Sequence, residues 1–230
     1  MGCRGLFVGG TDTAVGKTYV SCQILAQLHR LGRKAGAYKP ACSGAIFSES
    51  GQGHWEDIDR LSAWVNPAVP DERICPQRFL APLAPPRAAR LEGREVDLSK
   101  LHEGLAWWKT QVDWLVIEGA GGLLSPLHKT AAVADLAAAW GFPLLIVARA
   151  GLGTLNHTLM SIEVAEARGL RVAGVILNPS SGNDDMETIQ YNLEDLQSRT
   201  PVPVLGCLPW GSEEFDIAWS ELFDFSTGAV

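Results

Sequence analysis

Short apolar runs alternate with longer amphipathic stretches along this chain of 230 residues. The runs are rich in Val, Leu, Ile and Ala and end at Gly, Pro or polar residues, which is typical of buried strands. The longer stretches repeat apolar residues at helical spacing and predict helices. The predicted strands are Leu6–Gly9, Ala35–Tyr38, Trp114–Glu118, Leu144–Ala148, Val172–Leu177 and Val204–Leu208, and the predicted helices are Lys17–Leu31, Leu98–Val112, Ala131–Trp140, Thr154–Arg168 and Asp184–Ser198.

This alternation predicts an α/β fold with a mostly parallel central sheet flanked by helices. Ligands of such sheets bind at the carboxyl ends of the strands, where most of the predicted strands meet polar residues, glycine or proline. The proline-rich segment 49–94 interrupts the alternation, and we expect it to form loops and short helices over one rim of the sheet.

Composition narrows the class of protein. The hydrophobic content of 47% is sufficient for a sizeable core, and the length favours a single domain over residues 1–230. The net charge of −7 argues against sequence-independent nucleic-acid binding. There is no leader sequence and no apolar run near the ~18 residues of a membrane span, so we expect a soluble protein without a membrane partner. Five scattered cysteines indicate reduced thiols and a cytoplasmic location.

A glycine-rich segment, Gly10–Thr18, joins the first predicted strand to the first helix and ends in Gly-Lys-Thr. Such a loop wraps phosphate oxygens with backbone N–H groups, while the lysine reaches the β- and γ-phosphates and the hydroxyl holds Mg²⁺. The usual pattern has glycine where this chain has Thr11, and Gly10 lies one residue too early. The alternative is a plain turn before a helix, but the strand before and the helix after favour a nucleotide site.

Two further strand ends carry charged residues. Pro40 favours an extended Lys39, which then faces the same crevice as Lys17 rather than standing exposed at a strand end. Glu118 precedes a run of small residues and has the position of a carboxylate that binds Mg²⁺ beside a nucleotide. We expect Asp59 as the second carboxylate, with Asp57 as a competitor, although either residue can instead cap the short helix that follows.

The two remaining segments are less specific. Gly151–His157 joins the fourth predicted strand to its helix, and we interpret His157 as a packed or solvated helix residue, since no metal-ligand spacing surrounds it. Asn178 ends the fifth predicted strand before Pro179, where it can either donate its amide to a nucleotide base or form a plain turn.

Together these motifs closely resemble the dethiobiotin synthetase family over essentially the whole chain. The resemblance rests on segments in the same order as in that family: Gly10–Thr18, Tyr38–Gly44, Glu118–Gly122, Gly151–His157 and Gly174–Asn178, with the proline-rich Pro82–Ala89 between them. It implies a three-layer P-loop NTPase-like fold related to the MinD and ParA ATPases. It also implies a homodimeric enzyme that uses ATP, Mg²⁺ and CO₂ to close 7,8-diaminononanoate into dethiobiotin through carbamate and carbamoyl-phosphate intermediates.

The resemblance also assigns roles to residues. It implies Thr18, Asp59 and Glu118 as metal ligands, and Lys39, Lys17 and Thr13 as the catalytic groups around the γ-phosphate and carbamate. The nucleotide residues are Thr13, Ala14, Val15, Gly16, Lys17, Thr18, Asn178 and Pro209, with adenine held by Asn178 and the loop after Pro209. The substrate residues are Ser43, Lys39, Gly119, Ala120, Gly121 and Gly122, joined by Asn156 and Tyr191 of the second subunit, which bind the far carboxylate.

The chain departs from the family in two places. Ala14 stands where many relatives have glutamate, and Ser48–Glu56 aligns poorly, which leaves Asp57 open as the metal ligand.

Three other functions fit less well. A MinD- or ParA-like switch ATPase carries a lysine at the position of Asp12. A cobyrinic acid diamide synthase needs a further glutaminase domain. A nucleotide-binding scaffold whose site has decayed would not retain all four of Lys17, Thr18, Lys39 and Glu118.

Overall fold

The computed structural model describes residues 2–179, 181, 185–211 and 222. Within these residues, six parallel strands form the central sheet in the order β12-β11-β10-β1-β7-β2. The strands are β1 (Arg4–Gly10), β2 (Ala35–Tyr38), β7 (Trp114–Glu118), β10 (Leu144–Arg149), β11 (Val172–Asn178) and β12 (Val204–Cys207). The predicted α/β fold with a parallel sheet is therefore confirmed.

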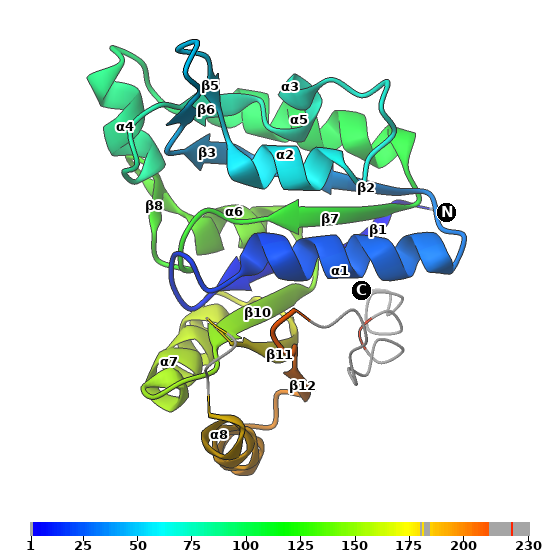
Figure 1. Ribbon diagram of the computed structural model, residues 1–230, viewed down its shortest axis with the longest axis vertical. Coiled ribbons are helices and arrows are strands. Elements are labelled where there is room, and N and C mark those ends of the chain that lie inside the picture. The colour runs from blue at the N-terminus through cyan, green and yellow to red at the C-terminus, as the bar shows by residue number, and fades with distance from the viewer. Residues whose placement is uncertain (1, 180, 182–184, 212–221, 223–230) are drawn as a thin grey trace.

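Helices lie on both sides of this sheet. Figure 1 shows α1 (Lys17–Arg30) crossing in front of the strands and α6 (Val133–Trp140) behind them. The other long helices, α5 (Leu98–Gln111), α7 (Thr154–Ala167) and α8 (Met186–Arg199), contact β2, β10 and β12 in turn. The arrangement has three layers, helix, sheet and helix.

Most differences from the predicted boundaries arise at element ends. Pairing between Arg149 and Asn178 extends β10 and β11 by one residue each. The helix predicted from Ala131 starts at Val133, because Ala131–Ala132 forms strand β9, which pairs with β8 (Pro126–His128). Asp185 caps α8 by accepting hydrogen bonds from the backbone N–H groups of its first turn, whereas Asp184 lies outside the described residues.

The proline-rich segment contains strands as well as the expected short helices. The helices are α2 (Glu56–Ser62), α3 (Asp71–Ile74) and α4 (Pro85–Leu91). Before α2, β4 (Ile46–Phe47) and β5 (Gly53–His54) form an antiparallel hairpin, and β6 (Gln77–Phe79), between α3 and α4, pairs in parallel with β3 (Ala41–Ser43). Because β3 follows Lys39 directly, this pairing holds Ser43 at the same edge of the molecule.

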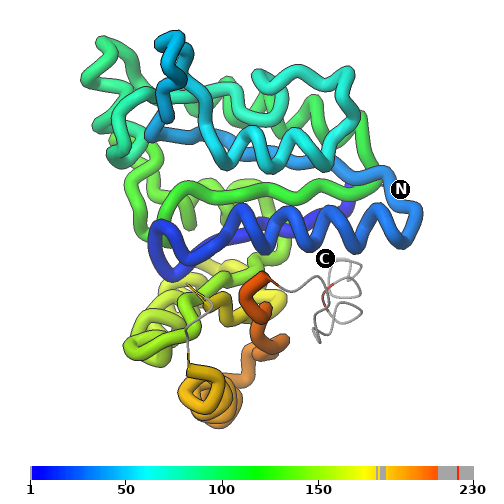
Figure 2. Tube along the Cα trace, viewed as in Figure 1, coloured from blue at the N-terminus to red at the C-terminus, as the bar shows by residue number. Residues whose placement is uncertain are grey.

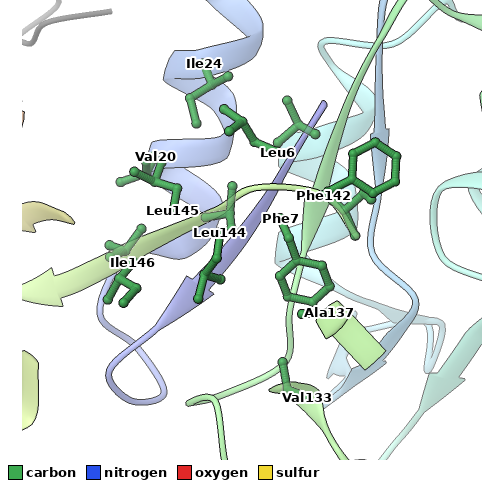
Figure 3. Close-up of a cluster of buried hydrophobic side chains, with 14 of the residues drawn as sticks. Leu6, Phe7, Val20, Ile24, Val133, Ala137, Phe142, Leu144, Leu145 and Ile146 are labelled. Atoms are coloured by element: carbon green, nitrogen blue, oxygen red, sulfur yellow. The ribbon is translucent and has the colours of Figure 1, made fainter. Parts of the chain in front are cut away.

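The core lies between α1 and the middle of the sheet. Val20 and Ile24 lie one turn apart on α1, and both are fully buried on the face of the sheet that also carries Leu6 and Leu145 (Figure 3). Burial of such side chains contributes roughly 1.5–3 kcal/mol each to folding. The packing fixes the direction of α1 relative to β1, so the loop between them has a defined position.

The carboxyl ends of β1, β2 and β7 reach the same edge of the sheet, on the left in Figure 2. All five cysteines are free thiols, as expected for a reduced protein. In the described part of the chain no helix has the length and apolar character needed to cross a membrane.

Candidate nucleotide and metal site

The loop between β1 and α1 has the geometry of a phosphate cradle. Gly16 lies in the left-handed region at φ 92°, and a Cβ there would lie 2.0 Å from the amide nitrogen of Asn178, so only glycine fits. Ala14 also has a positive φ, 57°, which no other non-glycine residue among those described shares. Val15, between them, is buried and anchors the loop.

Three hydrogen bonds hold this loop in shape. The Lys17 ammonium donates to the carbonyl oxygen of Asp12 at 2.8 Å, and the Asp12 carboxylate accepts from the Thr13 N–H at 2.7 Å. The side-chain amide of Asn178 donates to the Val15 carbonyl at 3.0 Å. The end of β11 is therefore in direct contact with the phosphate loop, 163 residues away in sequence.

A cluster of charges lies beside the loop, in which Lys39 and Glu118 are buried and Asp57 is partly exposed. The Thr18 hydroxyl is 2.7 Å from Asp57 Oδ1 and 2.8 Å from Glu118 Oε1. Lys39 Nζ is 2.5 Å from Asp57 Oδ2 and 2.5 Å from Glu118 Oε1. These four side chains come from α1, β7, α2 and the end of β2, and the fold brings them together.

Asp59, predicted as a metal ligand with Thr18 and Glu118, makes none of the contacts of this cluster. Its carboxylate is half-exposed and contacts His54 Nδ1 at 2.6 Å. Residues two apart on a helix point to nearly opposite sides, so α2 can direct only one of Asp57 and Asp59 towards the phosphate loop. The structure favours Asp57, the residue that the sequence left open.

The charges of the cluster shift one another's pKa. Burial raises the pKa of the Asp57 carboxyl, but the Lys39 ammonium and the hydrogen bonds from Lys39 and Thr18 prevail and hold it below its usual value. Burial would lower the pKa of Lys39, but the attraction of Glu118 and Asp57 raises it overall, so Lys39 is a cation. Burial lowers the pKa of Lys17 to about 8, although Glu118 opposes the shift.

The donor set fits Mg²⁺. The second oxygen of Glu118, Oε2, is buried and has no hydrogen-bond partner in the structure. Mg²⁺ binds one or two carboxylates and completes its shell with water and phosphate oxygens, so Asp57, Glu118 and the Thr18 hydroxyl suit it. No group of three or more His, Cys, Asp or Glu side chains with the spacing of a metal site exists among the described residues.

A cavity of about 600 Å³ opens over this cluster. Its walls include most of the predicted residues: Thr13, Ala14, Gly16, Lys17, Thr18, Lys39, Ser43, Glu118, Ala120 and Gly121. Sequence reasoning missed Tyr19, Cys42, Arg60 and Ser125. Arg60 lies almost one turn after Asp57 on α2, a spacing that the sequence contains, but no motif marks Ser125, whose hydroxyl accepts from the Gly122 N–H at 2.9 Å.

Eight predicted residues do not line this cavity: Val15, Asp59, Gly119, Gly122, Asn156, Asn178, Tyr191 and Pro209. Gly122 lines a second cavity of about 350 Å³, together with Thr11, Asp12 and the α7 residues His157 and Met160. Asn156 is exposed on α7, and Tyr191 is exposed on α8, where its hydroxyl donates to Glu187. Pro209 is half-buried just after β12, and the loop expected to follow it lies outside the described residues beyond Gly211.

Comparison with known proteins identifies the family. An ATP-dependent dethiobiotin synthetase of Anaeromyxobacter sp. is 47% identical over 94% of this chain and 92% of its own length. Proteins of the same name from Bacillus cereus and Rhodopirellula baltica are 40% and 39% identical over 92% and 86% of this chain, and over 85% and 81% of their own lengths. The chain belongs to the ATP-dependent dethiobiotin synthetase family. A family model described as an AAA domain also matches residues 4–213.

Solved structures support the fold of this dethiobiotin synthetase family member. A ParA family ATPase from Chlorobium tepidum has a TM-score of 0.52 at 11% identity, over 96% of this chain and 89% of that one. MinD in the MinC:MinD complex of Aquifex aeolicus has a TM-score of 0.51 at 19% identity, over 97% and 85%. At identities this low, the similarity shows the fold alone. The family assignment rests on the dethiobiotin synthetases that are 39–47% identical.

Proposed function

We propose that this chain closes 7,8-diaminononanoate and CO₂ into dethiobiotin with ATP and Mg²⁺, as a cyclo-ligase of biotin biosynthesis. The relatives' shared name supports the overall reaction. The observation that carries it to this chain is the cluster of Lys39, Asp57, Glu118 and Thr18 beside the phosphate loop.

The first step joins an amine of the substrate to CO₂. A free amine has a pKa near 10 and is mostly protonated at neutral pH, so a site must hold it neutral and close to CO₂. Ser43, Lys39, Ala120 and Gly121 line the cavity, and Gly119 and Gly122 are the sequence neighbours of the last two. We assign these groups to the diamine and to the carbamate that forms from it.

The second step transfers the γ-phosphoryl group of ATP to a carbamate oxygen and releases ADP. Phosphoryl transfer depends mainly on positioning and on positive charge around the transferred group. Lys17, Thr13 and Lys39 surround the space in which that group would lie. Asp57, Glu118 and Thr18 would hold Mg²⁺, which neutralises phosphate charge when it is bound.

Ring closure completes the reaction. The second amine attacks the carbonyl carbon of the carbamoyl phosphate, the bond to the phosphate oxygen breaks, and inorganic phosphate leaves with the ureido ring closed. No nucleophile from the protein is needed, so the cavity has only to hold the two amines together. We assign adenine to Asn178 and the segment at Pro209, since Asn178 already contacts the phosphate loop.

A homodimer completes this proposal. Leu124 and Met160, which line the second cavity, are each 55% exposed, and Leu152, in the loop before α7, is 97% exposed. Apolar side chains gathered at the rim of a cavity are typical of an interaction surface. We place a second subunit there, so that its Asn156 and Tyr191 bind the substrate's far carboxylate, and we place the enzyme in the cytoplasm because its thiols are free.

The test supplies purified protein with ATP, Mg²⁺, bicarbonate and 7,8-diaminononanoate and measures dethiobiotin by mass spectrometry. We expect dethiobiotin and ADP in equal amounts, with no ADP when the diamine is omitted. ATP hydrolysis that ignores the diamine and yields no ureido product would contradict the proposal and favour a MinD- or ParA-like switch ATPase.

A further inference from the structure

The Lys39 ammonium lies where a metal ion would bind. It is 2.5 Å from a carboxylate oxygen of Asp57 and 2.5 Å from one of Glu118, and the residue is 4% exposed. The Thr18 hydroxyl touches the same two carboxylates. A cation and a hydroxyl thus occupy the oxygens that suit Mg²⁺ in the proposed function.

Charge balance explains why the ammonium lies there. The buried Glu118 carboxylate loses hydration and is repelled by the partly exposed Asp57 carboxylate beside it, so a cation between the two is favoured. One ammonium offsets only one of the two negative charges. The Thr18 hydroxyl has a single proton for two acceptors, and Glu118 Oε2 has no partner at all. The cluster therefore retains the capacity for a doubly charged ion.

We propose that Lys39 is a stand-in cation that Mg²⁺ displaces. A dication balances Asp57 and Glu118 completely, so the ammonium then gains nothing from them and is repelled by the metal. Lys39 also lines the cavity that contains Lys17, Thr13 and Ser43, so its displaced side chain can turn towards the phosphate and carbamate without leaving the site. Arrival of the metal thereby releases the lysine that the reaction uses.

The use of the released lysine in catalysis rests on the proposed function. The displacement itself rests only on how Mg²⁺ binds to the protein. Lys39 and Mg²⁺ compete for the same carboxylate oxygens. Removing the ammonium must therefore strengthen Mg²⁺ binding to the nucleotide-free protein. If Lys39 were a neighbour that does not compete, its removal would leave this affinity unchanged.

The experiment titrates Mg²⁺ into nucleotide-free protein and follows heat by isothermal calorimetry and the melting temperature. Lys39→Met keeps the length of the side chain and removes its charge. We expect it to bind Mg²⁺ at least about tenfold more tightly than the wild type, because at 4 Å a unit charge changes the energy of another by several kcal/mol near a protein surface. Its melting temperature should be lower without metal and rise more steeply with it.

Two controls test whether Mg²⁺ binds at the carboxylates that Lys39 contacts. Lys39→Met combined with Glu118→Gln should lose the gain, since one metal carboxylate is then neutral. Lys17→Met removes a lysine of the same cavity whose ammonium contacts the Asp12 carbonyl and neither carboxylate. A gain as large as that of Lys39→Met in this variant would overturn direct displacement, because loss of any nearby charge would then suffice. Unchanged or weaker Mg²⁺ binding by Lys39→Met would overturn it too.

A second variant covers the case in which Lys39→Met does not fold. Lys39→Gln is neutral but can still donate one amide hydrogen bond to a carboxylate, and we expect the same direction of change. Because the titration contains neither ATP nor diamine, it is independent of the ring-closure assay. If Lys39→Met binds Mg²⁺ more tightly but the wild type makes no dethiobiotin, the displacement is supported and the proposed function fails. If the wild type makes dethiobiotin but Lys39→Met binds Mg²⁺ no more tightly, the proposed function is supported and the displacement fails.

Discussion

At the scale of single residues, Asp57 and Asp59 differ by helix phase alone. Both are acidic, and they are separated by one residue on α2, yet only Asp57 reaches Thr18 and Lys39. A sequence pattern cannot decide between them until the start of the helix is known, because a shift of one residue rotates every side chain by about 100°. For this reason the sequence could not choose between Asp57 and Asp59, while Glu118, whose place follows from the end of a strand, could be predicted to lie near the phosphate loop.

This difference gives a matched pair of variants. Asp57→Asn should lower turnover by about 10² or more, since electrostatic groups of an active site typically contribute factors of 10²–10³. Asp59→Asn removes the same charge on the same helix and should change turnover less than about twofold, as exposed charge pairs contribute little. Steady-state kinetics at varied Mg²⁺ measures both, and equal losses in the two variants would remove Asp57 from its proposed role.

The Lys17 ammonium predicts how nucleotide binding depends on pH. Burial lowers the pKa of Lys17 to about 8 in the free protein, so its proton is lost as pH rises through that value. ATP is held by the charged form, and above pH 8 its binding must take up a proton. We expect the affinity for ATP to fall between pH 7.5 and 9.5, approaching about tenfold per pH unit at the upper end.

Calorimetry of ATP binding in buffers of different ionisation heats checks this proton uptake. Lys17→Met is the control, because it has no proton to gain and should bind weakly at every pH in the range. A pH-independent affinity in the wild type would show that Lys17 retains its proton well above pH 8.

The same proton also affects stability, with a sign that follows from the direction of the shift. The pKa of Lys17 is lower in the folded protein, about 8, than its usual 10.5, so between these values the unfolded chain binds more protons. Stability due to this group therefore rises with pH across that window. Asp57 has the same sign in a lower pH window, because its lowered pKa contributes stability above its ordinary value of 3.8 that is lost as pH falls below it.

At the scale of elements, long strands and helices could be predicted and short ones could not. β2 and β7 have the predicted bounds because each is a continuous buried run that ends in a polar residue. The two-residue strands β4, β5 and β9 have no such pattern, since they are defined by a partner in space rather than by their own residues. For the same reason the sequence predicted only loops and short helices for segment 49–94, which carries Asp57 and also contains β5 and β6.

The contact between α5 and β2 predicts a sensitive glycine. A Cβ on Gly104 would lie 2.3 Å from the Tyr38 hydroxyl oxygen, which donates to the Leu101 carbonyl of the same helix. Gly104→Ala must move the helix away from the residue that precedes Lys39. We expect a loss of about 1–3 kcal/mol, because overpacking in a core costs that much, and a melting temperature lower by several degrees.

Thermal unfolding followed by circular dichroism measures this change. Glu103→Ala, at the neighbouring exposed position of α5, should stay within about 0.5 kcal/mol of the wild type. Wild-type stability in Gly104→Ala would mean that the Tyr38 ring has room to turn aside.

At the scale of the whole molecule, one chain brings together the phosphate loop and the charged cluster, whereas the proposal takes two substrate residues, Asn156 and Tyr191, from a second copy. The sheet order could be inferred only in part from sequence, since alternation predicts parallel strands and not that β1 lies between β10 and β7. Asn156 and Tyr191 lie outside the main cavity, and no pattern within a single chain can say what faces them.

The exposed Leu152 tests the proposed dimer. Leu152→Asp places a charge on the surface where the second subunit is expected, and burying an unpaired charge there is costly. We expect a monomer by size-exclusion chromatography with light scattering, and product formation reduced at least about tenfold with ATP binding retained. Arg199→Asp, on the distant end of α8, is the control, and a Leu152→Asp dimer with normal turnover would rule out this surface.

The wide spacing of the site along the chain has a consequence for how the protein is made. The hydrogen bond from Thr18 to Glu118 spans 100 residues, that of Lys39 to Glu118 spans 79, and Asn178 supports the phosphate loop from farther still. A growing polypeptide that has emerged only as far as β6 has the phosphate loop, Lys39 and Asp57, but it lacks Glu118 and Asn178. ATP cannot guide the early chain; it recognises, and so selectively stabilises, molecules whose synthesis has passed β11.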